Sequence, residues 1–180
     1  KIGLLRQEAQ TDPLTCLHNR RSLDMQISHL IAQRCPFAVL AIDIDHFKRV
    51  NDEFGHDIGD VVLQSLAKIL LDVTRDSDVV ARTGGEEFIV IMPRVEAKRA
   101  YQLAERLRMR VSESYIDPVG CINVSIGISG WPIEQLSIDE VFKLADQALY
   151  QAKKTGRNRS VVDATYSQDL APVSEPSILE

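Results

Sequence analysis

The chain has 180 residues, a net charge of −5, 44% hydrophobic residues and 26% charged residues, which is typical of one ordinary globular domain. Non-specific binders of nucleic acid or anionic membranes are usually basic, so the acidic balance argues against both. No apolar run approaches the roughly 18 residues that span a bilayer, and no signal-peptide pattern is present. Its three cysteines are well separated and indicate reduced thiols. We therefore expect a cytoplasmic domain without membrane or nucleic-acid contact, although an upstream region could anchor a longer protein.

Composition divides the chain into three parts. Residues 1–10 favour helix and indicate the end of a connecting, signalling helix from an upstream sensory or regulatory domain. Residues 11–163 alternate between helical and strand-like segments and form the one predicted domain. Residues 164–180 are rich in Ser and Pro and lack periodicity, which predicts a disordered tail.

Apolar residues recur at helical spacing in four segments, and we interpret each as a helix that packs on the core. These segments are 23–31, 62–73, 100–111 and 141–152. Strand-like runs lie between them at 37–44, 79–82, 88–92, 122–129 and 160–162. With a further helix that starts near Phe47, the predicted order of elements is α-β-α-α-β-β-α-β-α-β, without an internal repeat.

The stretch ARTGGEEF (residues 81–88) joins two of these strands. A Gly-Gly pair between strands predicts a hairpin turn, so this pair must be antiparallel. The predicted fold is a mixed α/β sheet with a central antiparallel hairpin, covered by helices. Glu86 and Glu87 follow the glycines where the next strand should begin, which suits either an acidic turn or an active site.

The first strand ends in DIDHFK (residues 43–48). Asp43 lies at the end of an apolar run, where a helix cap is unnatural. Asp45 is better placed to cap a helix that starts near Phe47, and we favour that role for it. Lys48 would lie in the first turn of this helix, against the dipole, unless an anion binds at the helix N-terminus.

Asn51 and Asp60 lie in a polar, glycine-containing stretch that precedes the next helix. Both are equally well explained as turn or cap residues. An Asp that accepts from the N1–H and N2–H₂ groups of guanine, with an Asn beside it, would also recognise that base.

Asp43 and Glu86 have a plausible meeting place, because the hairpin can pack beside the first strand. Carboxylates from neighbouring strand ends commonly hold Mg²⁺ together with substrate phosphates. Gly84 and Gly85 would let a nucleotide approach the backbone closely.

Two further polar stretches have both a structural and a functional interpretation. Gly156 suits a helix C-cap and Lys153 suits the negative end of the dipole, but Lys153 and Arg157 could equally contact phosphates. Arg75 and Asp78 form a charged turn between a helix and a strand, as many such turns do.

In order and spacing, these motifs resemble the GGDEF family of diguanylate cyclases, in its GGEEF variant. The resemblance covers about residues 11–163. It is carried by TDPLTCLHNRR (11–21), DIDHFK (43–48), the 51–60 stretch, RTGGEEF (82–88), SIG (125–127), ADQALYQAK (145–153) and GRN (156–158).

The resemblance implies a fold like that of nucleotidyl cyclases and the polymerase palm. It also implies a catalytic domain at 11–163 that condenses two GTP into cyclic di-GMP and two pyrophosphates. Each 3′-hydroxyl would attack the α-phosphate of the partner's GTP in line, which requires a two-fold homodimer.

The resemblance also implies roles by position for the reacting groups. Asp43 and Glu86, with the backbone carbonyl of Ile44, would ligate Mg²⁺, or Mn²⁺ in its place. Glu86 would accept the proton of the attacking 3′-hydroxyl, with Glu87 as a further contact. Lys48 would stabilise charge in the transition state.

Binding roles follow in the same way. The residues implied for GTP are Asn51 and Asp60 for guanine, His56 near the ribose or base, Gly84 and Gly85 beside the nucleotide, and Lys153 and Arg157 for phosphates. Arg75 and Asp78 match an Arg-x-x-Asp product-inhibition site, with Arg106 assisting from the next helix, so we expect feedback inhibition by cyclic di-GMP.

Two positions depart from the family pattern: Cys16 replaces a usual glycine, and Thr83 replaces a frequent large residue. Neither belongs to the metal or base set, so we expect activity to survive. The alternatives are a catalytically weak cyclic di-GMP-binding module that acts through partners, a cyclase that also accepts ATP, and an α/β domain without chemistry.

Overall fold

The computed structural model describes residues 10–131 and 136–167. Its helices are α2 (Arg20–Ala32), α3 (Phe47–Phe54), α4 (His56–Val73), α5 (Ala97–Glu113), α6 (Ile138–Lys154) and α7 (Ala164–Ser167). Its strands are β1 (Phe37–Ile44), β2 (Val79–Arg82), β3 (Glu87–Pro93), β4 (Tyr115–Ile116), β5 (Gly120–Cys121), β6 (Val124–Trp131) and β7 (Ser160–Val162).

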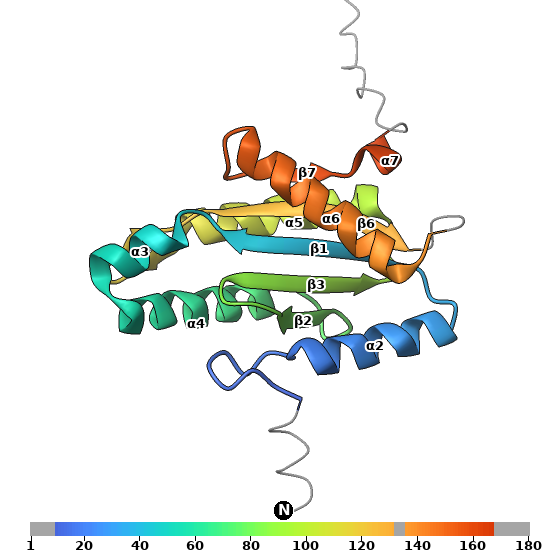
Figure 1. Cartoon of the computed structure of the whole chain (residues 1–180), viewed down its shortest axis with the longest axis horizontal. Coiled ribbons are helices and arrows are strands. Elements are labelled where there is room, and N and C mark those ends of the chain that lie inside the picture. Colours follow the sequence, from blue (N-terminus) through green and yellow to red (C-terminus); the bar gives the residue numbers. More distant parts are fainter. Residues whose placement is uncertain (1–9, 132–135, 168–180) are drawn as a thin grey trace, which may run out of the picture.

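Five strands form one sheet in the order β2-β3-β1-β6-β7 (Figure 1). The pairs β2–β3, β3–β1 and β1–β6 are antiparallel, and β6–β7 is parallel. The predicted mixed α/β fold is confirmed. The central strand is β1, which is buried along its whole length, whereas the β2–β3 hairpin lies to one side with β2 at the edge of the sheet.

Helices cover both faces of this sheet. Along β1, alternate side chains pack in opposite directions. Leu40 and Ile42 belong to the core shared with α4 and α5, and Val39 and Ala41 belong to the core shared with α2 and α6. This alternation puts Asp43 on the α2/α6 side.

Helix α6 lies directly on β6 at Gly127. A Cβ atom at this glycine would lie 2.1 Å from the Ala145 carbonyl oxygen and 2.2 Å from the Leu149 nitrogen, so no larger residue fits without moving the helix. This close approach brings the C-terminal end of α6 to the side of the sheet where β1 ends (Figure 1).

Most predicted elements have the expected positions, and a few differ. The bounds of β1, β2 and β7 agree with the prediction, β6 starts at Val124 rather than at residue 122, and the short β4–β5 hairpin was not predicted. Residues 164–167, which we assigned to the tail, form α7. Residues 1–9 of the expected connecting helix and the tail from residue 168 lie outside the described residues.

Among the helices at 10–131 and 136–167, none has the length and apolar character needed to cross a bilayer.

Candidate active site

An ion pair between a buried aspartate and a partly exposed lysine marks the end of β1. Asp43 is 5% exposed, and its Oδ2 lies 3.0 Å from Nζ of Lys153 near the C-terminus of α6. Burial raises the pKa of Asp43; Lys153 opposes this shift, while Glu87 and Asp45 add to it. The lysine therefore stabilises a carboxylate that its surroundings otherwise disfavour.

The hairpin turn brings further carboxylates to the same place. Asp43 and Glu87 are partners in the β1–β3 register, and Glu86 is half-buried beside them. Burial raises the pKa of Glu86, and the negative charges of Asp43 and Glu87 raise it further, against Lys153. Asp43 and Glu86 are therefore close enough for their charges to interact.

This donor set fits a magnesium ion. Among the described residues, no group of three or more His, Cys, Asp or Glu side chains is arranged to enclose a metal. Mg²⁺ usually takes one or two protein carboxylates and completes its shell with substrate phosphates and water. Asp43 and Glu86 supply such a pair, and a cation between them would relieve their repulsion.

The two glycines of the turn have different surroundings. A Cβ atom on Gly84 would lie 2.5 Å from a carboxylate oxygen of Glu87, whereas a Cβ atom on Gly85 would meet nothing within 4 Å. The Thr83 N–H closes the turn by donating to the Glu87 carbonyl at 3.0 Å. Gly84 thus leaves room for Glu87, and Gly85 leaves open space above the backbone.

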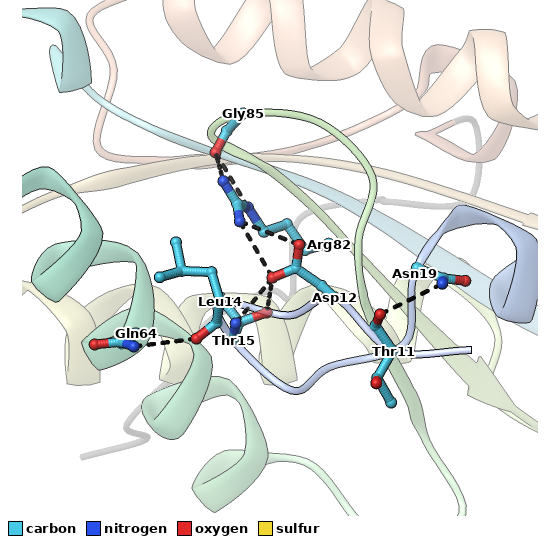
Figure 2. A network of polar contacts seen from close by, with 8 residues as sticks. All are labelled: Thr11, Asp12, Leu14, Thr15, Asn19, Gln64, Arg82 and Gly85. Carbon is cyan, nitrogen blue, oxygen red and sulfur yellow. Dashed lines mark hydrogen bonds and ion pairs between the residues drawn. The ribbon is translucent and has the colours of Figure 1, made fainter. Parts of the chain in front are cut away.

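Arg82 holds this turn from the side, as Figure 2 shows. Its guanidinium donates to the Gly85 carbonyl through Nε (3.2 Å) and Nη2 (2.8 Å), and its Nη1 donates to both carboxylate oxygens of Asp12. Asp12 also accepts from the backbone N–H and hydroxyl of Thr15. The segment 11–19 is therefore fastened to the Gly84-Gly85 turn.

Asp12 is ionised in this network. Burial works against its charge, but the hydrogen bonds from Thr15 and the ion pair with Arg82 outweigh burial, so the pKa of Asp12 lies below its ordinary value. Arg82 and Asp12 have no role predicted from the sequence. The available signals were an arginine at the end of a buried strand and an Asp-x-x-Thr turn pattern.

A groove of about 580 Å³ opens beside the carboxylates, and its lining includes Glu87, Lys153 and Tyr150. This volume lies within the range of small-molecule sites.

The residues predicted to recognise guanine lie on consecutive helices. Asn51 is on α3 and Asp60 is on α4, and the two helices meet at Gly55. A Cβ atom on Gly59 would lie 1.9 Å from Oδ1 of Asn51, so the Asn51 carboxamide occupies the space that this glycine leaves. Asp60 follows Gly59 and is exposed.

Helix α3 begins without a side-chain cap. His46 is its N-cap residue in a left-handed conformation, and the first turn holds no acidic side chain. Lys48 is exposed in that turn, and His56 is exposed at the start of α4. The capping role predicted for Asp45 is wrong: its carboxylate accepts from the Ser125 hydroxyl and from the backbone N–H of Asn158 instead.

Arg157 lies in the turn that ends α6. Its N–H donates to the Ala152 carbonyl at 2.9 Å, which is the longer hydrogen bond of a Schellman motif. The C-cap residue of α6 is Thr155 rather than Gly156, which follows it with φ 129°, and the exposed Arg157 has φ 61°. The structural role of this turn and the phosphate interpretation are therefore compatible.

The residues of the expected inhibitory site are only partly together. Arg75 donates to the Asp78 carboxylate through its backbone N–H (2.9 Å) and Nη2 (3.0 Å), and both residues line a cavity of about 270 Å³ with Cys16. Arg106 instead donates to the Val73 carbonyl at 3.2 Å and does not line this cavity.

Comparisons with known proteins identify the family of this chain. The family profile described as diguanylate cyclase, GGDEF domain, matches residues 9–159. The chain is 40% identical over 162 residues to the probable diguanylate cyclase DgcT of Escherichia coli, an alignment that covers 86% of this chain and 36% of DgcT. It thus spans about a third of that relative's length.

Solved structures show the same likeness. The coiled coil and GGDEF domain of DgcB from Caulobacter crescentus, in complex with c-di-GMP, superpose with a TM-score of 0.82 at 32% identity, covering 89% of each chain. The active GGEEF domain of a diguanylate cyclase from Vibrio cholerae has a TM-score of 0.75 at 37% identity, covering 81% of this chain and 96% of that one. The chain belongs to the GGDEF family.

Proposed function

We propose that this domain condenses two GTP molecules into cyclic di-GMP and two pyrophosphates. One observation carries the proposal: the Asp43 and Glu86 carboxylates and the Lys153 ammonium converge where β1 ends beside the hairpin turn. The similarity to DgcT, a probable diguanylate cyclase, and to the active GGEEF domain of a diguanylate cyclase from Vibrio cholerae supports this activity.

Asp43 and Glu86, with the carbonyl oxygen of Ile44, would hold Mg²⁺ or Mn²⁺. When bound, the ion would neutralise phosphate charge and favour ionisation of the attacking hydroxyl. Support comes from the two carboxylates, whose mutual repulsion a cation would relieve.

The reaction joins the 3′-oxygen of one GTP to the α-phosphorus of the other. The bond from that phosphorus to the pyrophosphate oxygen breaks, and the hydroxyl proton passes to Glu86. The raised pKa of Glu86 makes it a stronger base than an exposed glutamate. Glu87 would assist beside it, and Lys48, at the uncapped start of α3, would stabilise the developing phosphate charge.

Substrate binding would divide between two regions. Asn51 and Asp60 would bind guanine, with His56 near the ribose or base, while Lys153 and Arg157 would bind phosphates. Gly84 and Gly85 would form the backbone surface beside the nucleotide, which the open space over Gly85 supports.

Catalysis by this route requires two copies of the domain. Each copy holds one GTP, and the ring closes only when both 3′-oxygens have reacted with the partner's nucleotide. We therefore propose a two-fold homodimer, controlled in a longer protein by an upstream sensory or regulatory domain.

The central test is product formation. The purified chain is incubated with Mg²⁺ and either GTP or ATP, and the product is identified by mass. We expect cyclic di-GMP from GTP, a loss of at least a hundredfold in Glu86→Gln and Asp43→Asn, and unchanged activity in Glu96→Gln, an exposed carboxylate before α5. No cyclic dinucleotide from a dimeric sample, or full activity in Glu86→Gln, contradicts the proposal.

Product inhibition is a separate part of the proposal. Arg75 and Asp78 would bind cyclic di-GMP at the cavity that they line, and Arg106, which does not line this cavity, would assist from α5. Arg75→Ala should raise the inhibition constant for cyclic di-GMP at least tenfold without changing the initial rate, while Arg99→Ala on the exposed side of α5 should change neither. An unchanged inhibition constant in Arg75→Ala rules this site out.

A further inference from the structure

Asp45, which directly follows β1, makes different contacts from Asp43. Asp45 is 8% exposed. Its Oδ1 accepts from the Ser125 hydroxyl at 2.7 Å, and its Oδ2 accepts from the backbone N–H of Asn158 at 2.8 Å. One partner is on β6 and the other is in the turn after α6, so Asp45 joins the end of β1 to that turn.

The turn that Asp45 holds contains Arg157. Three successive residues have positive φ angles: Gly156 (129°), Arg157 (61°) and Asn158 (44°). Positive φ is unfavourable for a residue such as arginine, so surrounding contacts must maintain this conformation.

Two contacts fix Asn158 from different sides. Asp45 binds its backbone N–H, and Nη1 of Arg108 donates to its side-chain oxygen at 2.9 Å. Arg108 is itself fixed by two hydrogen bonds to Glu105 on the same helix, α5. The backbone that carries Arg157 is thus fastened to the central strand and to a helix on the opposite face of the sheet.

The two aspartates at the end of β1 therefore contact both ends of the cationic segment 153–157. Asp43 binds the Lys153 ammonium, and Asp45, two residues later, binds the turn that carries Arg157. We propose that Asp45 is a positioning residue: through the Asn158 N–H it holds Arg157 in the conformation that contacts the triphosphate of GTP. This inference rests on the proposed function, in which Arg157 binds phosphate.

The test separates phosphate from base recognition. Binding of 3′-deoxyguanosine triphosphate, which lacks the attacking hydroxyl, and of guanosine is measured by calorimetry. Asp45→Ala should weaken triphosphate binding at least tenfold, as Arg157→Ala does, and leave guanosine binding unchanged. The double variant should bind no more weakly than Arg157→Ala alone, because Asp45 acts through Arg157.

Two substitutions at the same carboxylate site serve as controls. In Asp45→Asn, the amide oxygen can accept from Asn158 while its NH₂ donates to Ser125, so binding should stay within threefold of the parent. Ser125→Ala removes the other hydrogen bond of Asp45 and should also stay within threefold. If Asp45→Ala does not fold, Asp45→Leu replaces it, because leucine is similar in size to aspartate but cannot accept a hydrogen bond from Asn158.

The outcomes distinguish this inference from its premise. If Arg157→Ala leaves triphosphate binding unchanged, the proposed role of Arg157 fails. If Arg157→Ala weakens binding but the folded Asp45 variant does not, only the positioning role fails. The positioning role also fails if the losses of triphosphate affinity in the two single variants multiply in the double variant. It fails likewise if Asp45→Ala weakens guanosine binding as much as triphosphate binding, because either result indicates a general effect on the domain.

Discussion

At the scale of single residues, the site concentrates negative charge that the fold itself does not need. Asp43 and Glu86 both have pKa values raised first by burial, and the neighbouring carboxylates add to the shift. Lys153 balances only part of this charge. The arrangement is therefore unfavourable for the ligand-free protein and favourable for a bound cation, a common relation between function and stability.

Removing one charge should therefore stabilise the ligand-free domain. In the presence of a chelator, Glu86→Gln should raise the free energy of unfolding by a few tenths of a kcal/mol, since Glu86 is partly exposed and solvent screens the repulsion. Denaturant unfolding of Glu86→Gln, with Glu96→Gln as the matched control, measures this. A less stable Glu86→Gln protein contradicts the repulsion argument.

Gly59 allows a second prediction, in which stability and binding change in opposite directions. Alanine in place of a helical glycine stabilises by roughly 0.5–1 kcal/mol, but a Cβ atom here would displace the Asn51 carboxamide. Gly59→Ala should therefore melt no lower than the parent, yet its KM for GTP should rise at least tenfold. Unchanged KM would show that the position of Asn51 does not matter for guanine.

At the scale of elements, the β2–β3 hairpin is bound by a segment that lies far from it in the sequence. Residues 11–19 run beside β2, where the His18 N–H donates to the Val80 carbonyl and the Arg82 N–H donates to the His18 carbonyl. Arg82 then connects Asp12 to the Gly85 carbonyl (Figure 2). A shift of this segment would therefore displace the turn that carries Glu86.

Arg82→Lys tests this connection. A lysine ammonium cannot reproduce the planar, multiple contacts of the guanidinium with Gly85 and Asp12. We expect a loss of about 1 kcal/mol in the free energy of unfolding and at least a tenfold lower kcat, with KM for GTP changed less. Arg99→Lys is the control. Wild-type kcat in Arg82→Lys would mean that the turn holds its shape unaided.

At the scale of the whole molecule, a tyrosine side chain replaces the strand partner of β6 beyond the end of β7. Parallel pairing of β6 with β7 ends at Ile128 and Val162. Beyond it, the Tyr166 hydroxyl of α7 donates to the Gly130 carbonyl and accepts from the Gly130 N–H at 2.9 Å. Tyr166 thus continues the pattern of hydrogen bonds where the strand stops.

Tyr166→Phe should lower the free energy of unfolding by about 1–3 kcal/mol, because two backbone groups lose their partner. Burial raises the pKa of Tyr166 to about 12. Since this pKa is raised, the contribution is fully present below the ordinary value of 10.0 and is lost as pH rises toward 12. The difference in the free energy of unfolding between the parent and Tyr166→Phe should therefore narrow above pH 10. Tyr150 is 61% exposed, so Tyr150→Phe should leave the free energy of unfolding unchanged.

Sequence patterns predicted the helices and strands well, because the features that determine these elements lie within short segments of the chain. The alternating and helical periods of apolar residues are set by which face of a strand or helix meets the core. The hairpin required only Gly84-Gly85 between two strands. The meeting of Asp43 with Glu86 was also predictable, because an antiparallel neighbour brings the start of β3 to the end of β1.

The long-range contacts of Asp45, Arg82 and Tyr166 were not predicted from the sequence. Asp45 precedes a helix as a cap residue would, but its partners, Ser125 and Asn158, lie 80 and 113 residues away in the chain. The link from Arg82 to Asp12 spans 70 residues, and that from Tyr166 to Gly130 spans 36. No local period records such contacts.

The sequence by itself determined the fold class, the family and the chemical character of the site, because these depend on patterns and residue types within short segments. The tertiary structure alone decided that the β2–β3 hairpin lies to one side of β1, that Lys153 pairs with Asp43, and that Asp45 secures the turn of Arg157. These features depend on which strands become neighbours and on the close contact of α6 with Gly127. Packing in three dimensions sets both.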